Sequence, residues 1–340
     1  MSKARDLADL SNSKTEIDNV NDIISSGALS HRNMLINPDF LVCQRSTSVS
    51  SVNTAGYKVA DRWGTNLNNS GTWTISQKND APAGLSKSLK YTCDNADTTP
   101  NVLQHYQSIE GQNVTRLAYG TSSAKLATLS FWVKSNVVGT YSVRLYKTEG
   151  VARLHTTNYT ISQADTWEFK TVTVQPDLVY GTANDASLGI GVAWWLCAGT
   201  NYDSGSPTSG WENYSAPNEA PSQVNVAAQV GNYWQIAGTQ FELGPVTPFV
   251  ARPIGEELSL CQRYYKDHPA QSMNYHAFRY SSSLSIAEVH FPVTMRVTPT
   301  YTQQGNGTVV SEVASVNGLT IVFNGLDGNI INTYTADAEL

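Results

Sequence analysis

The sequence predicts a mainly β protein: an antiparallel jelly-roll β-sandwich, a short helix and a small antiparallel β domain, with a short N-terminal helical segment in front. Three observations support this. Charged residues make up only 15% of the chain, against a typical ~25%. Apolar and polar residues alternate with the period-two pattern of strands through residues 33–252. Asn-Gly and Asp-Gly pairs, which favour hairpin turns, punctuate residues 270–340.

Composition and charge exclude some kinds of binding partner for this protein. The net charge is −6 and the sequence pI is near 5.5, whereas a nucleic-acid partner requires a basic face. No apolar run approaches the ~18 residues of a membrane span, and the first residues lack the apolar core of a signal peptide. We therefore expect no nucleic-acid binding, no membrane insertion and folding in a cytoplasm. The four scattered cysteines are expected to be reduced and mostly buried.

Residues 1–32 differ from the rest of the chain. Four apolar residues at heptad-like spacing predict a short amphipathic helix: Leu10, Ile17, Val20 and Ile24. The sequence Ser25-Ser26-Gly27 ends this helix. Two heptads are too few to hold a coiled coil alone. Two interpretations stay open: a frayed terminal helix, or an anchoring and oligomerisation segment that orders against a larger assembly or a sister subunit.

Residues 33–252 carry the predicted sandwich. The segments ATLSFWVKS (127–135), TYSVRLYK (140–147) and WEFKTVTV (167–174) alternate like half-buried strands. The continuous apolar run LGIGVAWWLCAG (188–199) has the length of a fully buried strand. Strand tryptophans are mostly buried, so six are predicted to be core residues: Trp63, Trp73, Trp132, Trp194, Trp195 and Trp234.

Prolines at 245, 248 and 253 end this domain. Residues 253–269 are predicted to be a helical linker, because Leu258, Cys261 and Tyr265 share one face of a helix over 256–265. In the small domain (270–340), every odd position from Ala287 to Val297 is apolar. GTVVSEVASV and LTIVF are predicted to pair across Asn317-Gly318, with NIINTYTA (329–336) returning beside them.

No catalytic constellation is visible. The six histidines lack zinc-ligand spacing, and the chain has no nucleophile elbow, P-loop or dinucleotide-binding glycine motif. Paired carboxylates could cleave glycosides, and Asp203, Glu212 and Glu219 occur in one loop, but loop carboxylates are usually solvated. The sequence therefore predicts a protein that is not an enzyme.

The polar segment 198–222 is the best candidate for a binding surface. Long loops without their own structure tend to be functional or disordered. Aromatic faces can stack on sugar rings, with neighbouring polar groups binding the hydroxyls. On this basis the predicted glycan-binding residues are Tyr202, Asp203, Trp211 and Tyr214. A subunit interface or simple packing at the end of the sandwich would use the same rings.

Two strings bracket the sandwich: NMLINPDFLVCQR (33–45) with YKVADRW (57–63), and FELGPVTPFVARPIGEELSLCQRYY (241–265). They resemble bacteriophage virion appendage proteins, in particular tail fibres of marine phages, in which a jelly roll similar to carbohydrate-binding modules lies between such strings. The start SKARDLADL and the phrase YTADAEL (334–340) are also similar to that group. The chain departs from the family pattern at Pro38 and Cys43, where Gly and Trp are common.

The resemblance implies further properties. The brackets would be the first and the closing strand of the sandwich. A structural calcium ion would be held between them by Asp39 and Glu242, since calcium takes several oxygen ligands. Fibres of this kind are usually homotrimers, and residues 1–32 would contact other virion proteins.

Together these observations predict a structural virion protein, a tail fibre or similar appendage, that attaches to host cell-surface glycans. Weak binding of single sugars would be compensated by multivalency in an oligomer. Two alternatives stay open. One is a capsid or tail decoration or adaptor protein that makes only protein contacts. The other is a polysaccharide depolymerase using Asp203 or Glu212.

Overall fold

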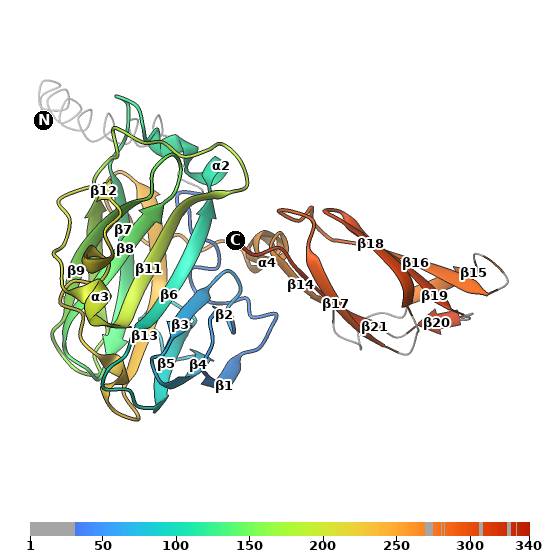
Figure 1. The fold of residues 1–340 in the computed structure, drawn as a ribbon, viewed down its shortest axis with the longest axis horizontal. Coiled ribbons are helices and arrows are strands. Elements are labelled where there is room, and N and C mark those ends of the chain that lie inside the picture. Colours follow the sequence, from blue (N-terminus) through green and yellow to red (C-terminus); the bar gives the residue numbers. More distant parts are fainter. Residues whose placement is uncertain are drawn as a thin grey trace, which may run out of the picture.

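The computed structural model describes residues 31–268, 275–279, 281, 283–305, 309–324, 328–330 and 332–340. The helix predicted over 10–24 lies outside these residues. The described chain forms a large β-sandwich and an elongated β region that extends from it, with the helix α4 between them (Figure 1). None of the helices in these ranges has the length and hydrophobicity needed to cross a membrane.

Two antiparallel sheets form the sandwich in the described residues, as predicted. The six-stranded sheet has the order β1 (Ser48–Val52), β4 (Thr72–Lys78), β5 (Ser88–Asn95), β13 (Tyr233–Leu243), β7 (Ala127–Ser135), β10 (Glu168–Val174). The seven-stranded sheet has the order β12 (Glu212–Asn213), β9 (Arg153–Ile161), β8 (Gly139–Lys147), β11 (Leu188–Ala198), β6 (Val102–Glu110), β3 (Gly64–Asn68), β2 (Gly56–Tyr57). The apolar run at 188–199 is the central strand β11, which confirms its prediction as a buried strand.

Short helical turns lie in the connections of the sandwich. They are α2 (Gly111–Val114), η1 (Thr115–Leu117), α3 (Thr200–Asp203), η2 (Ala216–Asn218) and η3 (Val226–Ala228). The segment 198–222 therefore has local structure, although the sequence predicted an unstructured loop. It folds back on the seven-stranded sheet, because Tyr202 and Ala220 pack on the outward-facing Trp195.

The sandwich core is rich in aromatic residues. Five of the six tryptophans predicted to be core residues are buried: Trp63, Trp73, Trp194, Trp195 and Trp234. The prediction is wrong for Trp132, which is half-buried on the outer face of the six-stranded sheet beside Phe169. Its neighbours Phe131 and Val133 point inward, so period-two alternation turns Trp132 outward. The four cysteines are free; three are buried and Cys43 is half-buried.

A histidine lies at the centre of this aromatic core. His105 is fully buried, its ring stacks on Trp63 with centroids 4.7 Å apart, and its Nδ1 lies 3.0 Å from the hydroxyl oxygen of Tyr91. Burial lowers the pKa of His105 to about 3. The imidazole is therefore neutral in the folded state at neutral and mildly acidic pH.

We expect His105 to make the sandwich acid-sensitive. An unfolded histidine titrates near ~6.5, so between that pH and about 3 the unfolded state binds a proton that the folded state does not. The free energy of unfolding should then fall as the pH drops below ~6.5. Nitrogen-15 NMR should show a neutral His105 ring at pH ~5. A titration midpoint near the ordinary histidine pKa would contradict the buried, neutral ring.

The opening and closing brackets meet, but not as two strands. Residues 33–45 form no strand, although a first strand was predicted there. Pro38 supplies no backbone N–H, and Asn37 and Phe40 have positive φ angles of 55° and 53°. The segment instead combines isolated backbone bonds with side-chain bonds. Met34 N donates to the carbonyl oxygen of Phe241 (2.8 Å). Asn33 Nδ2 donates to the carbonyl oxygen of Thr239 (2.8 Å), and Asn33 Oδ1 accepts from Phe241 N (3.0 Å). The brackets therefore close the sandwich through an irregular, buried segment.

The region after the sandwich departs from the predicted helical linker. The helix α4 covers Ile254–Gln262, and β14 (Tyr265–His268) is already a strand that pairs with β21 (Asn332–Asp337). The helix stops early because the chain then turns into the C-terminal sheet: Ala338 N donates to the carbonyl oxygen of Tyr264 (2.7 Å).

The C-terminal region contains two sheets in its described residues. One has the order β14, β21, β17 (Thr300–Gly305). The other has the order β18 (Val309–Ser315), β19 (Gly318–Asn324), β16 (Leu284–His290), β15 (Tyr275–Arg279), β20 (Gly328–Ile330). The predicted pairing of the segments that form β18 and β19 is confirmed, but the turn lies one residue earlier than predicted, at Val316 and Asn317, because Gly318 already pairs with Ser315. The predicted return of 329–336 beside that hairpin is wrong, because β21 pairs with β14 and β17 and only the short β20 joins the hairpin's sheet.

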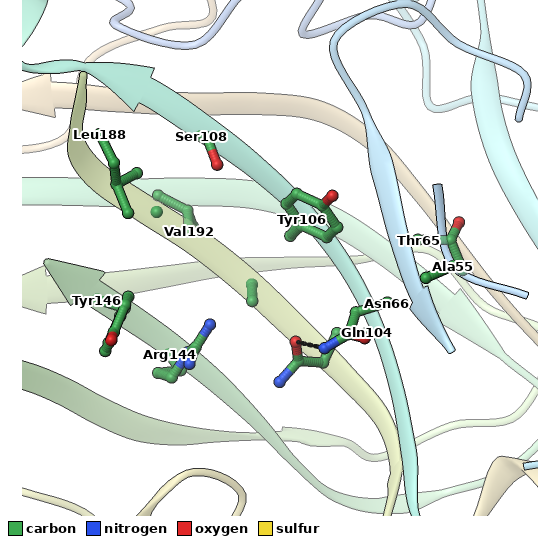
Figure 2. A pocket seen from close by; sticks show the side chains of 12 residues that line it. Ala55, Thr65, Asn66, Gln104, Tyr106, Ser108, Arg144, Tyr146, Leu188 and Val192 are labelled. Carbon is green, nitrogen blue, oxygen red and sulfur yellow. Dashed lines mark hydrogen bonds between the residues drawn. The ribbon is translucent and has the colours of Figure 1, made fainter. Parts of the chain in front are cut away.

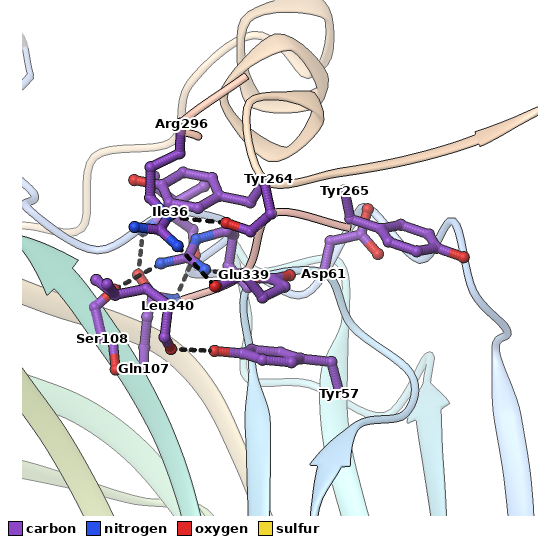
Figure 3. A network of polar contacts seen from close by, with 12 residues as sticks. Ile36, Tyr57, Asp61, Gln107, Ser108, Tyr264, Tyr265, Arg296, Glu339 and Leu340 are labelled. Atoms are coloured by element: carbon purple, nitrogen blue, oxygen red, sulfur yellow. Dashed lines mark hydrogen bonds and ion pairs between the residues drawn. The ribbon is translucent and has the colours of Figure 1, made fainter. Parts of the chain in front are cut away.

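A network of polar contacts joins the last residues to the sandwich (Figure 3). The guanidinium of Arg62, fully buried, pairs with the carboxylate of Glu339 and lies 3.4 Å from the centre of the Tyr264 ring. Tyr57 Oη donates to the carbonyl oxygen of Leu340 (2.7 Å). Arg296 donates to the carbonyl oxygens of Ala338 (2.8 Å) and Glu339 (2.9 Å). The end of β21 is thereby fixed against the sandwich.

Candidate functional site

A pocket of about 240 Å³ lies on the outer face of the seven-stranded sheet (Figure 2). It spans four neighbouring strands, β8, β11, β6 and β3. Tyr106 of β6 lies on one side, and Arg144 and Tyr146 of β8 lie on the other. Between them β11 presents Gly191 and Ala193, which are the register partners of these larger residues. Two small residues on the central strand, flanked by large ones, therefore form the hollow.

Glycine also permits the position of Tyr106. A Cβ atom on Gly64 of β3 would lie 2.3 Å from Cζ of the Tyr106 ring, closer than any two such atoms can approach. With glycine there, the ring lies against β3 and beside Tyr57, with ring centroids 6.0 Å apart. Burial raises the pKa of Tyr106, so its hydroxyl stays protonated and can donate as well as accept a hydrogen bond.

The polar groups of the pocket form one connected chain. Asn66 Nδ2 donates to Gln104 Oε1 (3.1 Å), and Gln104 Nε2 donates to Glu219 Oε2 (3.3 Å). The same carboxylate oxygen accepts from Arg144 Nη1 (3.0 Å). The guanidinium also lies over the Tyr146 ring, 4.9 Å from its centre. The pocket thus offers fixed amide and hydroxyl groups and a paired charge.

Part of the predicted glycan-binding set reaches this site. Tyr214 is 42% exposed, and its ring meets Tyr146 edge to face with centroids 5.9 Å apart. Burial, and then the nearby Glu219 carboxylate, raise the pKa of Tyr214. The segment 198–222 therefore contributes Tyr214 and Glu219 to the edge of the pocket.

The other three residues of that set lie elsewhere. Trp211 is buried, 7% exposed, against Tyr119 and His155, so its prediction as a sugar-stacking surface is wrong. Tyr202 packs on Trp195, and Asp203 lines a separate polar pocket at one end of the sandwich. The pairing of β12 with β9 carries Trp211 inward, which a loop without strands would not do.

The protein itself binds both oxygens of Glu242 but only one of Asp39, whose buried Oδ1 has no hydrogen-bond partner among the described residues. Both oxygens of Glu242 accept hydrogen bonds, from Gln240 Nε2, Thr247 N and Thr247 Oγ1. Asp39 Oδ2 accepts from Ser86 N, and burial raises the pKa of Asp39 to about 6. The described part of the chain contains no group of three or more His, Cys, Asp or Glu side chains that could hold a metal. Hydrogen-bond donors already occupy both oxygens of Glu242, where a cation would have to bind. Asp39 and Glu242 therefore do not fit a calcium ion.

Comparison with known proteins yields only distant structural matches, with 10–16% identity in the examples of highest rank. Neither the protein-family models nor the curated proteins include a match. Among 52 matching solved chains is the enzymatically active domain of tailspike protein 4 of bacteriophage CBA120, with 14% identity and a TM-score of 0.35 over 63% of this chain. The aligned part spans only 22% of that tailspike chain.

Two further similar structures are shorter than the present chain. A putative sugar binding protein from Bacteroides thetaiotaomicron VPI-5482 matches with 13% identity and a TM-score of 0.33, over 62% of this chain and all of that one. A structure described as CBM4 matches with 16% identity and a TM-score of 0.28, over 61% of this chain and 98% of that one. The class that the strand order defines is an antiparallel jelly-roll β-sandwich with an open pocket on one sheet.

Proposed function

We propose that this protein binds a glycan in the pocket between Tyr106 and Tyr146. The observation that carries the proposal is the composition of the pocket: two tyrosine rings face a floor of Gly191 and Ala193, with amide groups along one side. Tyrosine rings can stack on the apolar face of a sugar, and fixed amides can exchange hydrogen bonds with its hydroxyls. Because Arg144 is already paired with Glu219, the site favours an uncharged sugar.

The pocket supports binding without hydrolysis. Glycoside cleavage uses two carboxyl groups on either side of the bond, whereas the carboxylate of Glu219 at the edge of this pocket is paired with Arg144. Asp203 lines the pocket at the end of the sandwich and Glu212 is exposed on β12. We therefore propose a non-catalytic binding protein rather than a depolymerase.

Tyr106→Ala should weaken glycan binding about tenfold or more, since loss of one stacked ring removes ~1.4 kcal/mol or more. The probe is a glycan array of neutral and acidic oligosaccharides, followed by calorimetry with the best neutral oligosaccharide found. Phe169→Ala is the matched control, because it removes a 45% exposed ring from the opposite sheet. Equal losses for both variants, or no signal from wild-type protein on the array, would contradict the proposal.

We further propose that the protein is part of a bacteriophage appendage that attaches to host surface glycans. The support is the resemblance of the bracketing strings at 33–63 and 241–265. Recombinant protein should then reduce adsorption of the phage to host cells, and the Tyr106→Ala variant should not. Peptides of this chain should also be found in purified particles.

A further inference from the structure

A short strap of residues 219–221 crosses the outer face of the seven-stranded sheet beside the glycan pocket. Ala220 is fully buried against β6 and β11. The carbonyl oxygen of Pro221 accepts hydrogen bonds from Ser142 Oγ of β8 (3.1 Å) and Asn158 Nδ2 of β9 (3.0 Å). None of these contacts uses the first side chain of the strap, so a substitution there should leave the strap in place.

That first residue is Glu219, whose carboxylate joins the two strands on either side of β11. Its Oε2 accepts from Arg144 Nη1 of β8 (3.0 Å) and from Gln104 Nε2 of β6 (3.3 Å). Glu219 is only 5% exposed, and salt and water screen buried charges less than exposed ones. The strap therefore places one poorly screened negative charge directly beside the guanidinium that lines the pocket.

Arg144 depends on this strap for its counter-charge. Within the described residues, Glu219 is its one ion-pair partner. The Nε atom of Arg144 is buried and has no hydrogen-bond partner in the same part of the chain. A guanidinium can bind a carboxylate through two parallel N–H groups. If Glu219 were neutral, Arg144 would be free to bind the carboxylate of a ligand in this way.

We propose that Glu219 restricts the pocket to uncharged sugars, and that the pocket without this carboxylate binds acidic sugars through Arg144. The inference rests on the proposed glycan site and adds its selectivity. A ligand carboxylate at Arg144 meets the like charge of Glu219 and competes with it for the same donors, whereas a sugar hydroxyl carries no charge to repel. Glu219 acts through Arg144, so selectivity comes from the strap rather than from the strands that form the floor.

Glu219→Gln should raise the affinity for an acidic oligosaccharide about tenfold or more, as expected for one new hydrogen-bonded charge pair. The two probes are the neutral oligosaccharide selected on the glycan array and its derivative with one sugar oxidised to the uronic acid. Calorimetry gives the ratio of their dissociation constants. A purely structural role of Glu219 would predict only losses of binding, so a gain for the acidic probe identifies the effect of charge.

Glu212→Gln is the matched control, because it removes the same charge from the same segment at an exposed position on β12. Its ratio of dissociation constants should stay at the wild-type value. Glu219→Ala gives a second variant that also frees Arg144, and melting temperatures show which variants fold. Adding Arg144→Gln to Glu219→Gln should abolish the gain for the acidic probe.

The outcomes separate this inference from the glycan site itself. If wild-type protein binds the neutral probe but neither Glu219 variant gains affinity for the acidic one, the selectivity inference is wrong and the glycan site stands. The same conclusion follows if Glu212→Gln produces an equal gain, or if the gain survives the loss of Arg144. Wild-type protein that binds neither probe would overturn both proposals.

Discussion

Replacing Arg62 with Ala should lower the free energy of unfolding by about 3 kcal/mol, because removing one partner of a buried ion pair leaves the other charge poorly compensated. The partner is Glu339, whose side chain is only 5% exposed. Among the described residues, its carboxylate then keeps only the longer contact to Arg45 Nη1 (3.4 Å). Arg62 also donates to the carbonyl oxygen of Ser108 (2.6 Å) and stacks on Tyr264. The substitution therefore affects β6, the turn after α4 and the residues after β21 together.

Tryptophan fluorescence during urea unfolding measures this effect, since all eight tryptophans lie between residues 63 and 234 and report on the sandwich. Glu339→Gln and the double variant complete a double-mutant cycle with Arg62→Ala. The coupling energy between Arg62 and Glu339 from this cycle should exceed ~1 kcal/mol. Lys170→Ala removes the partner of Glu168 in a more exposed pair and should cost less than ~1 kcal/mol. A cost for Arg62→Ala as small as that of the control would show that Glu339 does not depend on Arg62.

Replacing Trp63 with Ala should destabilise the sandwich by about 3–5 kcal/mol, as expected for a buried tryptophan. Trp63 is 2% exposed and contacts the rings of His105, Phe40 and Trp194. Its indole Nε1 donates to the carbonyl oxygen of Asn37 (2.7 Å), so the substitution also removes a contact that holds the irregular opening segment.

Trp132→Ala provides the comparison for Trp63→Ala, because it removes the same side chain from the outer face of β7. Half-buried surface positions usually contribute about 1 kcal/mol or less. The urea concentrations at the midpoint of unfolding, measured for the two variants and the wild type, rank their stabilities. This comparison requires that the free energy of unfolding falls with urea at the same slope in all three. Equal midpoints for the two variants would contradict the assignment of Trp63 to the core and Trp132 to the surface.

Local periodicity predicted several of the strands of this fold. The period-two run at 127–135 coincides with β7, and the apolar run at 188–199 contains β11. The Asn317-Gly318 pair marked the hairpin between β18 and β19 to within one residue, since the loop residues are Val316 and Asn317, and Gly318 already belongs to β19. Patterns that depend on neighbouring residues alone were therefore predictable.

Pairings between distant segments were not predictable in the same way. Residues 329–336 alternate as a strand should, but nothing local specifies that β21 pairs with β14, a segment predicted to be helical. The opening string was predicted to be a strand, yet side chains of Asn33 and Asn37 satisfy the backbone there. Side-chain hydrogen bonds across more than two hundred residues leave no local pattern.

The candidate site was only partly predictable. The exposed tyrosine at 214 was found because it lies in a long polar segment. Tyr106, Arg144 and Tyr146 were missed because the pocket depends on which strands are neighbours. The available signal was the pair of small residues, Gly191 and Ala193, at alternate positions in a strand of large ones, which marks a hollow once β6 and β8 are known to flank β11.

The contact between Asn33 and the segment 239–241 has a consequence for the order of folding. It joins residues 206 to 208 positions apart, so the sandwich cannot close until nearly all of its sequence has been synthesised. Folds dominated by such distant contacts form slowly and expose unpaired strand edges meanwhile. The nascent chain therefore spends its synthesis with a half-built sheet exposed, and the yield of soluble protein should depend on chaperones and on low temperature during expression.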